Sequence, residues 1–492
     1  MDDTDEFDAI PVEGDRRGAR FLHSMQPAQG TERLARGVLS TFDVASSTMA
    51  NIAPAMSFYF SFAIIAGTSG LASPLVIILA AVAIAILGNT VAEFSRSTPS
   101  AGSFVAFVGK SFGPIAGVTT ALTISAGYVI AISAVVVISG GWFDTMVQRY
   151  LRFSAPWEIY ASAFVIGAAY MMYRGVRVST KLAAALLITE MAILLVVSVA
   201  LLVDHHRSLT LQPFNPAKLS GGLSGLSLGF PLAMFMFVGW ENSASLAEET
   251  SEPRHNVPRA IYASVGIMAL AYVVLSYATE VAFGGNVRAI AGSSVPFLDA
   301  ANGLSGLLLF FAYLAGMTSI VGSLMSAANS QSRIIFSSGR EGILPGFSAR
   351  VSAGRRTPWS GIALFLGAAL TISFVFGRRT DPVVFFGQIA TLGTILVALV
   401  YLVSNLALPF YYRRHHPDEF DISRHLVLPA LGVLCIGLPL YELLKPGQGA
   451  PFGYFPYIAL AIVALSVAYA FHLSRRDPGL AERIGSFVAD SD

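Results

Sequence analysis

Apolar runs of roughly 20 residues recur along nearly the whole chain, and they constrain the fold more than any other feature. A helix of about 20 residues crosses the roughly 30 Å of hydrocarbon in a bilayer. Of the 492 residues, 54% are hydrophobic and only 12% are charged, whereas roughly 25% are charged in an ordinary soluble domain. The sequence therefore predicts an all-α polytopic membrane protein, and we count twelve transmembrane helices.

The twelve spans divide the chain into consecutive parts. These are an N-terminal tail (1–40), a first group of five spans (41–203), a second group of five (221–404), a loop (405–425), spans eleven and twelve (426–473) and a C-terminal tail (474–492). The N-terminal tail is acidic and then basic, without the apolar core of a signal peptide. With this end inside, most of the 31 Lys and Arg residues fall on the cytoplasmic side. We therefore expect a multi-pass protein of the plasma membrane, with both termini and the loop 405–425 in the cytoplasm.

Other classes of protein find little support in the sequence. No polar segment is long enough to bury a core of its own, so we expect no soluble catalytic domain. His205 and His206 are adjacent and lack a cluster of Cys or carboxylates, and the single Cys435 lies in an apolar run. The net charge of +1 carries no information on nucleic acids, because the position of basic residues relative to the spans matters more. We predict no enzyme activity, cofactor, metal ion or nucleic-acid partner.

The first span carries a proline near its middle, in the run Asn51–Ser57. Proline removes a hydrogen-bond donor and clashes with the preceding turn, so Pro54 should break or kink the helix. A half-helix starting at about Ala55 would direct free N–H groups and its positive end into the midplane, which suits a substrate carboxylate. The alternative is an ordinary proline kink without a ligand.

The stretch Met234–Ile261 contains a glycine and a carboxyl group at the depth of the bilayer, Gly239 and Glu241. Freed backbone groups and a charge both need partners that hydrocarbon cannot supply. These residues therefore belong beside a cavity. The alternative is that Gly239 serves close helix packing and that Glu241 is buried and neutral.

Three stretches resemble the amino acid, polyamine and organocation (APC) permeases over roughly residues 40–410. The sixth-helix signature F-x-G-x-E, followed by E-E-x-x-x-P-x-x-x-x-P-x-A-I, is matched by Phe237, Gly239, Glu241, Glu248, Glu249, Pro253, Pro258, Ala260 and Ile261. The run from Glu93 to Phe104 is similar to the family's loop after helix two. Ser332–Pro345, with Thr357 and Pro358, resembles the motif S-R-x-x-x-x-x-x-R-D/E-G-x-L-P and its downstream T-P. The resemblance implies a 5+5 inverted repeat of the leucine-transporter type, with discontinuous helices 1 and 6 and two further C-terminal helices.

The resemblance also implies a binding site between spans one, three, six, eight and ten. The substrate carboxylate would meet amides near Ala55, Met56 and Ser57, and its ammonium group would meet carbonyls. The implied ammonium acceptors are the carbonyls of Ile52, Phe235 and Val238. The remaining implied site residues are Tyr128, Gly239 and Glu241. The first span has Ala-Pro-Ala-Met where many relatives have a Gly-Ser-Gly turn, and Trp240 replaces a smaller residue.

A carboxyl group halfway along the fifth span, Glu190, is the candidate for ion coupling. Such a group is costly in lipid and tends to mark ion or proton pathways. Some proton-coupled relatives carry a lysine at this place, where sodium-coupled members of the wider fold hold sodium. We therefore predict proton coupling; the alternative is a neutral Glu190 bonded to a neighbouring helix. Sodium remains the alternative ion, because Thr318, Ser319 and Ser323 supply hydroxyls in span eight.

These observations predict a secondary active transporter that carries amino acids or related amines by alternating access, as a proton symporter. Few charged residues line the predicted pocket, which favours a neutral amino acid. The alternatives are exchange of substrates, or polyamine import in which Glu241 or Glu190 attracts a second amine. A non-transporting amino acid sensor would need a larger cytoplasmic extension than these tails provide.

Overall fold

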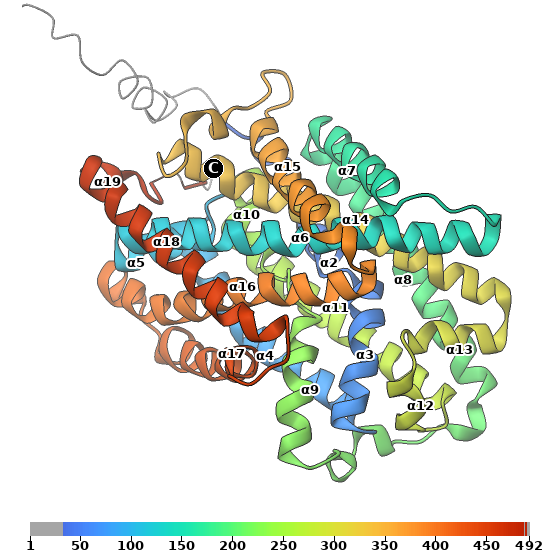
Figure 1. Ribbon diagram of the computed structural model, residues 1–492. Coiled ribbons are helices and arrows are strands. Elements are labelled where there is room, and N and C mark those ends of the chain that lie inside the picture. The colour runs from blue at the N-terminus through green and yellow to red at the C-terminus, as the bar shows by residue number, and fades with distance from the viewer. Residues whose placement is uncertain (1–32, 487, 490–492) are drawn as a thin grey trace, which may run out of the picture.

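The computed structural model describes residues 33–486, 488 and 489, which form helices joined by turns and loops (Figure 1). Most of the predicted tail 1–40 lies outside the described residues, as does the end of the tail 474–492. In the described part, ten helices are long and apolar enough to cross a membrane. The prediction of an all-α polytopic architecture is confirmed.

The helices follow one another through short connections. The first half holds α2 (Thr41–Ile52), α3 (Pro54–Ser69), α4 (Ser73–Ser97), α5 (Phe104–Phe112), α6 (Pro114–Leu151), α7 (Trp157–Tyr173) and α8 (Val176–Asp204). The second half holds α9 (Leu223–Phe235), α10 (Asn242–Ser245), α11 (Pro253–Ala282), α12 (Val287–Gly292), α13 (Pro296–Leu304), α14 (Gly306–Arg340), α15 (Trp359–Phe376) and α16 (Pro382–His415). The chain then forms α17 (Leu428–Leu444), α18 (Phe455–Arg476) and α19 (Leu480–Arg483).

The broken first span lies inside the bundle, because α2 packs against α8, α11 and α14 while α3 packs against α9 and α12 (Figure 1). Around it, α6 runs along α16, α14 along α8, and α11 along α4. Helix α7 lies outside α6, and α17 and α18 cover α4, α16 and α6 from the other side (Figure 1). The centre of the bundle is thus the place where the first span is interrupted.

Two of the twelve predicted spans are not among the ten long helices. The fourth, α7, has 17 residues. The sixth is divided into α9 with 13 residues and α10 with 4 residues. The number of twelve crossings therefore stays a prediction.

Several helices are longer than the apolar runs that predict them. The apolar run of the eighth span predicts a helix over about residues 303–326, but α14 continues to Arg340. Helix α16 continues past residue 404, the predicted end of the second group of spans, to His415. The first half of the predicted loop 405–425 is therefore helical. Tertiary contacts explain this extension, because the buried hydroxyl of Tyr412 donates to the carbonyl of Glu93 at the end of α4.

Both described ends of the chain lie at one end of the bundle, where α4 ends and α11 begins. The amides of Val38 and Leu39 donate to the carbonyl of Glu249, just before α11. At the other terminus, the amide of Ala489 donates to the carbonyl of Pro99, just after α4.

Candidate functional site

The first span is interrupted at one residue, Ala53, between α2 and α3. Ala53 has φ 58° and ψ 75°, a left-handed conformation, and Pro54 is the first residue of α3. Proline is well suited to the first position of a helix, since its missing N–H would have no partner there. The amides of Ala55 and Met56 are left without acceptors within their own helix.

Side chains from two other helices accept these amides. The amide of Ala55 donates to Oε1 of Glu190 in α8 at 2.6 Å, and that of Met56 donates to Oγ of Ser319 in α14 at 3.1 Å. The next amide, that of Ser57, donates to the carbonyl of Ala53 at 2.9 Å. The three amides predicted to meet a substrate carboxylate are therefore all bonded within the protein here.

The carbonyls at the end of α2 are also bonded by side chains. Ser323 Oγ donates to the carbonyl of Asn51 at 3.2 Å, and Ser57 Oγ donates to that of Ile52 at 2.6 Å. Thr318, the third hydroxyl predicted near this break, donates to the carbonyl of Ala315 in its own helix.

The sixth span is interrupted between Phe235 and Asn242, where the chain forms a series of turns. Gly239 has φ 105° in the middle of these turns, a conformation that L side chains rarely adopt. Successive amides donate three residues back, from Val238 to Phe235 and from Asn242 to Gly239.

The two interruptions touch each other. Asn51 Nδ2, at the end of α2, donates to the carbonyl of Gly239 at 3.3 Å. A Cβ added to Gly239 would lie 2.6 Å from this nitrogen, so only glycine allows the approach. Beyond this contact, Thr48 and Ser243 join α2 to α10 through their hydroxyls at 2.6 Å.

A cavity of about 80 Å³ lies beside the two interruptions. Seven of the nine predicted substrate-binding residues line it: Ile52, Met56, Ser57, Tyr128, Phe235, Val238 and Gly239. The wall is completed from α2, α3, α6, α14 and α16 by Asn51, Phe60, Ser61, Ala131, Ile132, Val135, Ser323, Phe386, Ala390 and Thr394. The lining is mainly apolar, and none of the described residues that form it carries a charged side chain. It comes from the same five spans that the sequence analysis named.

The other two predicted residues lie behind this wall. Ala55 is fully buried and held by Glu190. Glu241 is 4% exposed, and its Oε1 accepts a hydrogen bond from the hydroxyl of Tyr128. Its Oε2 has no hydrogen-bond partner among the described residues.

Buried ion pairs join the family-like stretches at the end of the bundle where both described termini lie. Arg333 in α14 pairs with Glu249, and both side chains are 1% exposed. Arg340 makes a bidentate pair with Glu248, at 2.6 and 3.0 Å. Glu248 also accepts the amide of Ala101 in the loop after α4.

Comparison with known families shows which family this chain belongs to. The family model described as "Amino acid permease" matches residues 37–467. The chain belongs to this permease family. The resemblance to APC permeases that the three motifs predicted is thereby confirmed.

Curated relatives of this permease cover most of its length at low identity. The branched-chain amino acid permease BcaP of Bacillus subtilis is 25% identical over 76% of this chain and 81% of its own. The methylthioribose transporter of the same organism is 23% identical over 85% and 90%. The low-affinity putrescine importer PlaP of Escherichia coli is 23% identical over 84% and 90%. All three names describe transport.

Sequence reasoning missed part of the cavity wall in this permease. Tyr128, Ala131, Ile132 and Val135 follow helical spacing along one face of α6, so the tyrosine alone could have pointed to the others. Phe386, Ala390 and Thr394 repeat every four residues in α16 but carry no unusual residue type. Nothing in the sequence marked them.

Proposed function

We propose that this permease is a secondary active transporter of amino acids or related amines, working by alternating access as a proton symporter. The observation that carries the proposal is the hydrogen bond from the amide of Ala55 to Glu190. It joins the N-terminal end of a half-helix, which suits an anionic substrate group, to a buried carboxyl group that can take up a proton.

The packing of the helices supports a 5+5 inverted repeat of twelve crossings. Under this repeat, spans one to five (α2/α3, α4, α6, α7, α8) correspond to spans six to ten (α9/α10, α11, α14, α15, α16). The contact of α6 with α16 then corresponds to that of α14 with α8, and both occur. The same holds for α6 with α7 and α14 with α15, and for α2 with α11 and α9 with α4. In such repeats, the substrate site lies where the two broken helices meet.

In the proposed mechanism, the substrate carboxylate replaces Glu190 as the acceptor for the amide of Ala55. Two carboxylates so close together in a buried site repel each other, so a proton must first neutralise one of them. Protonation of Glu190 weakens it as an acceptor and removes the repulsion. The amides of Ala55 and Met56 then become available to the substrate, and proton and substrate bind together.

The substrate ammonium group would lie at the carbonyls of Ile52, Phe235 and Val238. These carbonyls belong to residues that line the cavity. A cavity of about 80 Å³ is smaller than ligand pockets of roughly 300–1,000 Å³. The walls contributed by α6 and α16 must therefore move outward when substrate binds, as alternating access requires.

The lining favours a neutral amino acid with an apolar side chain. Phe60, Phe235 and Phe386 line the cavity, and no Asp, Glu, Lys, Arg or His does so in the part of the chain that the structure describes. The similarity to a branched-chain amino acid permease supports the same class. A second candidate is an amine or polyamine, since Oε2 of the buried Glu241 lacks a partner among the described residues and one relative is a putrescine importer.

We place this permease in the plasma membrane with both termini in the cytoplasm. Basic residues gather at the end of the bundle where the described termini lie, including Arg96, Arg254 and Arg340. An excess of Lys and Arg is typical of cytoplasmic loops.

Uptake by the purified protein in proteoliposomes tests the proposal. An inward pH gradient should drive accumulation of labelled leucine or isoleucine, and a sodium gradient at constant pH should not. Putrescine in the same assay tests the second candidate. Accumulation driven by sodium and indifferent to pH would overturn proton coupling, and counterflow without gradient-driven accumulation would identify an exchanger. Binding of either substrate without any flux would identify a sensor.

A further inference from the structure

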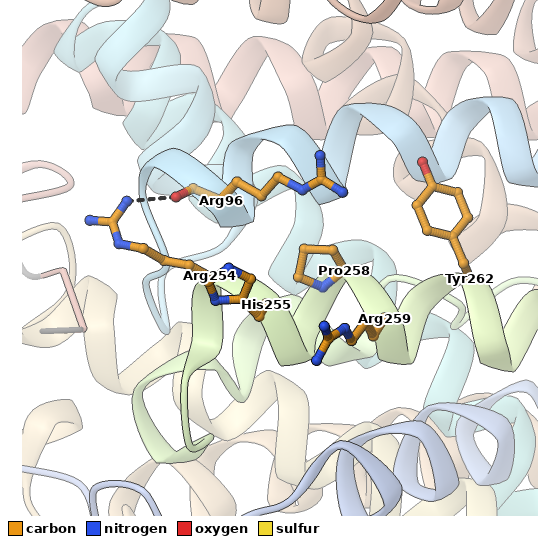
Figure 2. A pocket seen from close by; sticks show the side chains of 6 residues that line it. All are labelled: Arg96, Arg254, His255, Pro258, Arg259 and Tyr262. Carbon is orange, nitrogen blue, oxygen red and sulfur yellow. Dashed lines mark hydrogen bonds between the residues drawn. The ribbon is translucent and has the colours of Figure 1, made fainter. Parts of the chain in front are cut away.

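A second hollow, of about 700 Å³, lies between the end of α4 and the start of α11, away from the central cavity. It is lined by Arg96, Arg254, His255, Pro258, Arg259 and Tyr262, and it shares none of these with the central cavity. Figure 2 shows Arg96 on α4 and the other five side chains on α11, with Arg96 running along α4 and Tyr262 reaching from α11 toward α4. Nothing in the proposed transport mechanism uses this hollow.

The charge of the hollow is positive. Three arginines line the hollow. The charge of one of them, Arg96, is offset by an ion pair with Glu93 at 3.0 Å. Arg254 donates to the carbonyls of Arg96 and Ser97 at 2.5 and 3.0 Å, and it forms no ion pair among the described residues (Figure 2). Arg259 is exposed and makes no hydrogen bond or ion pair among the described residues. Two guanidinium charges therefore face the hollow without a carboxylate.

The polarity of the hollow changes along α11. Arg254, Pro258 and Tyr262 are spaced four residues apart, so they share one face of the helix. At about 1.5 Å per residue, this face leads over roughly 12 Å from guanidinium groups to an aromatic ring. Tyr262 is 40% exposed, and it points from a membrane-spanning helix. A ligand with a charged end and an apolar end fits this gradient better than a small soluble ion.

The hollow lies at the ends of two candidate membrane spans, where lipid headgroups are expected. Arg96 is in the last turn of α4, and Arg254 and Arg259 are in the first two turns of α11, both of which are candidate membrane spans. Basic pockets between transmembrane helices on the cytoplasmic side bind anionic lipid headgroups. We infer that this hollow binds an anionic phospholipid, with its phosphate at Arg254 and Arg259 and the start of its acyl chains along Pro258 and Tyr262. The inference does not depend on which substrate the permease carries.

Lipid retention by the purified full chain tests the inference. The delipidated protein is titrated with phosphatidylglycerol or with phosphatidylcholine of the same acyl chains, and bound lipid is counted by native mass spectrometry. We expect a preference of at least fivefold for phosphatidylglycerol, which Arg259→Gln reduces several-fold. The matched control is Arg476→Gln, since Arg476 is also exposed at the end of a spanning helix but lies outside the hollow. Equal retention of both lipids, or an equal loss in both variants, would overturn the inference.

Two further measurements separate a lipid from a soluble phosphate. Glycerol 1-phosphate should not displace bound phosphatidylglycerol at equal concentration, whereas displacement would assign the hollow to a soluble anion and overturn the lipid. Tyr262→Ala should lower retention of long-chain phosphatidylglycerol, and unchanged retention would contradict the proposed acyl contact. Size-exclusion chromatography of each variant confirms that it is folded before lipid is added.

Discussion

The carboxyl group of Glu190 accepts the amide hydrogen of Ala55 at 2.6 Å, although 135 positions separate the two residues in the chain. The helix that begins at Pro54 therefore starts with an acceptor from within the protein. A free half-helix end would otherwise expose this amide inside the bundle, where an unpaired donor costs roughly 1–3 kcal/mol. Glu190 thus has a structural role in this state as well as its proposed role in coupling.

Replacing Glu190 with glutamine should separate these two roles. Glutamine keeps a carbonyl oxygen that can accept the amide of Ala55, but it can neither gain nor lose a proton. We expect Glu190→Gln to retain substrate counterflow in proteoliposomes and to lose accumulation driven by a pH gradient by more than tenfold. The control is Glu280→Gln, because Glu280 is equally buried but does not line the central cavity. Normal accumulation by Glu190→Gln would assign Glu190 to structure alone.

Gly239→Ala should damage both stability and transport. The φ of 105° is strained for alanine, and its Cβ would lie 2.6 Å from Asn51 Nδ2. We expect a loss of about 1–3 kcal/mol in the free energy of unfolding, together with loss of uptake. Gly266→Ala is the matched control, since that glycine is helical with open space around it, and alanine there should be neutral or stabilising. Equal behaviour of the two variants in thermal unfolding and uptake would contradict the prediction.

The buried pair of Arg333 and Glu249 should be sensitive to removal of one partner. Arg333→Gln leaves a buried carboxylate without its counter-charge, at a cost of roughly 3–5 kcal/mol. Arg378→Gln removes an ion pair with Glu158 in which Arg378 is 66% exposed, and should cost at most about 1 kcal/mol. Denaturant unfolding in detergent measures both. The double variant Arg333→Met/Glu249→Leu should lose less stability than its two single variants lose together. A loss in the double variant equal to the sum of the two single losses would rule out coupling between the two charges.

Stability should also depend on pH through Glu341, which directly follows α14 and lies outside the candidate membrane spans. Burial, the main cause, raises the pKa of Glu341 to about 7, against an ordinary value of 4.5. The folded protein therefore binds this proton more tightly than the unfolded chain, so the stabilisation is full below pH 4.5 and is lost as pH rises through 7. We expect the melting temperature of the wild type to be lower at pH 8 than at pH 5, by an amount equivalent to roughly 2 kcal/mol from this group.

Glu341→Gln should reduce that difference between pH 5 and pH 8. The side chain accepts hydrogen bonds from Ser337 and from the amide of Gly485, and glutamine can still accept both. An unchanged pH dependence in the variant, measured by thermal unfolding in detergent, would show that other groups cause it.

Local signals in the sequence were sufficient for some elements and insufficient for others. The apolar runs predict the fourth span at about 157–173 and the ninth at about 359–376, and α7 and α15 have these bounds. Each run is preceded by a proline, at Pro156 and Pro358, which marks where the helix begins. The end of α14 was predicted too early, because Arg333 and Arg340 look like residues of a polar loop. Their partners Glu249 and Glu248 lie in another part of the chain and make their burial tolerable.

In the candidate site, too, some features could be predicted from the local sequence and others depended on tertiary contacts. Pro54 and Gly239 could be recognised from the local sequence. Proline removes a hydrogen-bond donor from a helix, and glycine adopts backbone conformations that other residues avoid. The acceptors Glu190 and Ser319 could not be assigned to particular amides, because they belong to α8 and α14 and reach the break only through tertiary packing. Sequence reasoning therefore found the residues around the break but left its amides free for substrate.

Helix α14 touches both regions that the proposed mechanism requires to change. Near its middle, Ser319 and Ser323 hold the two sides of the break between α2 and α3. About 20 Å further along, at roughly 1.5 Å per residue, Arg333 and Arg340 hold the segment that follows α10. Because α14 is one continuous helix with contacts at both levels, a tilt that weakens its hydrogen bonds at the break would also strain the ion pairs at its end. Substrate capture and opening toward that end of the bundle would then be one mechanical event.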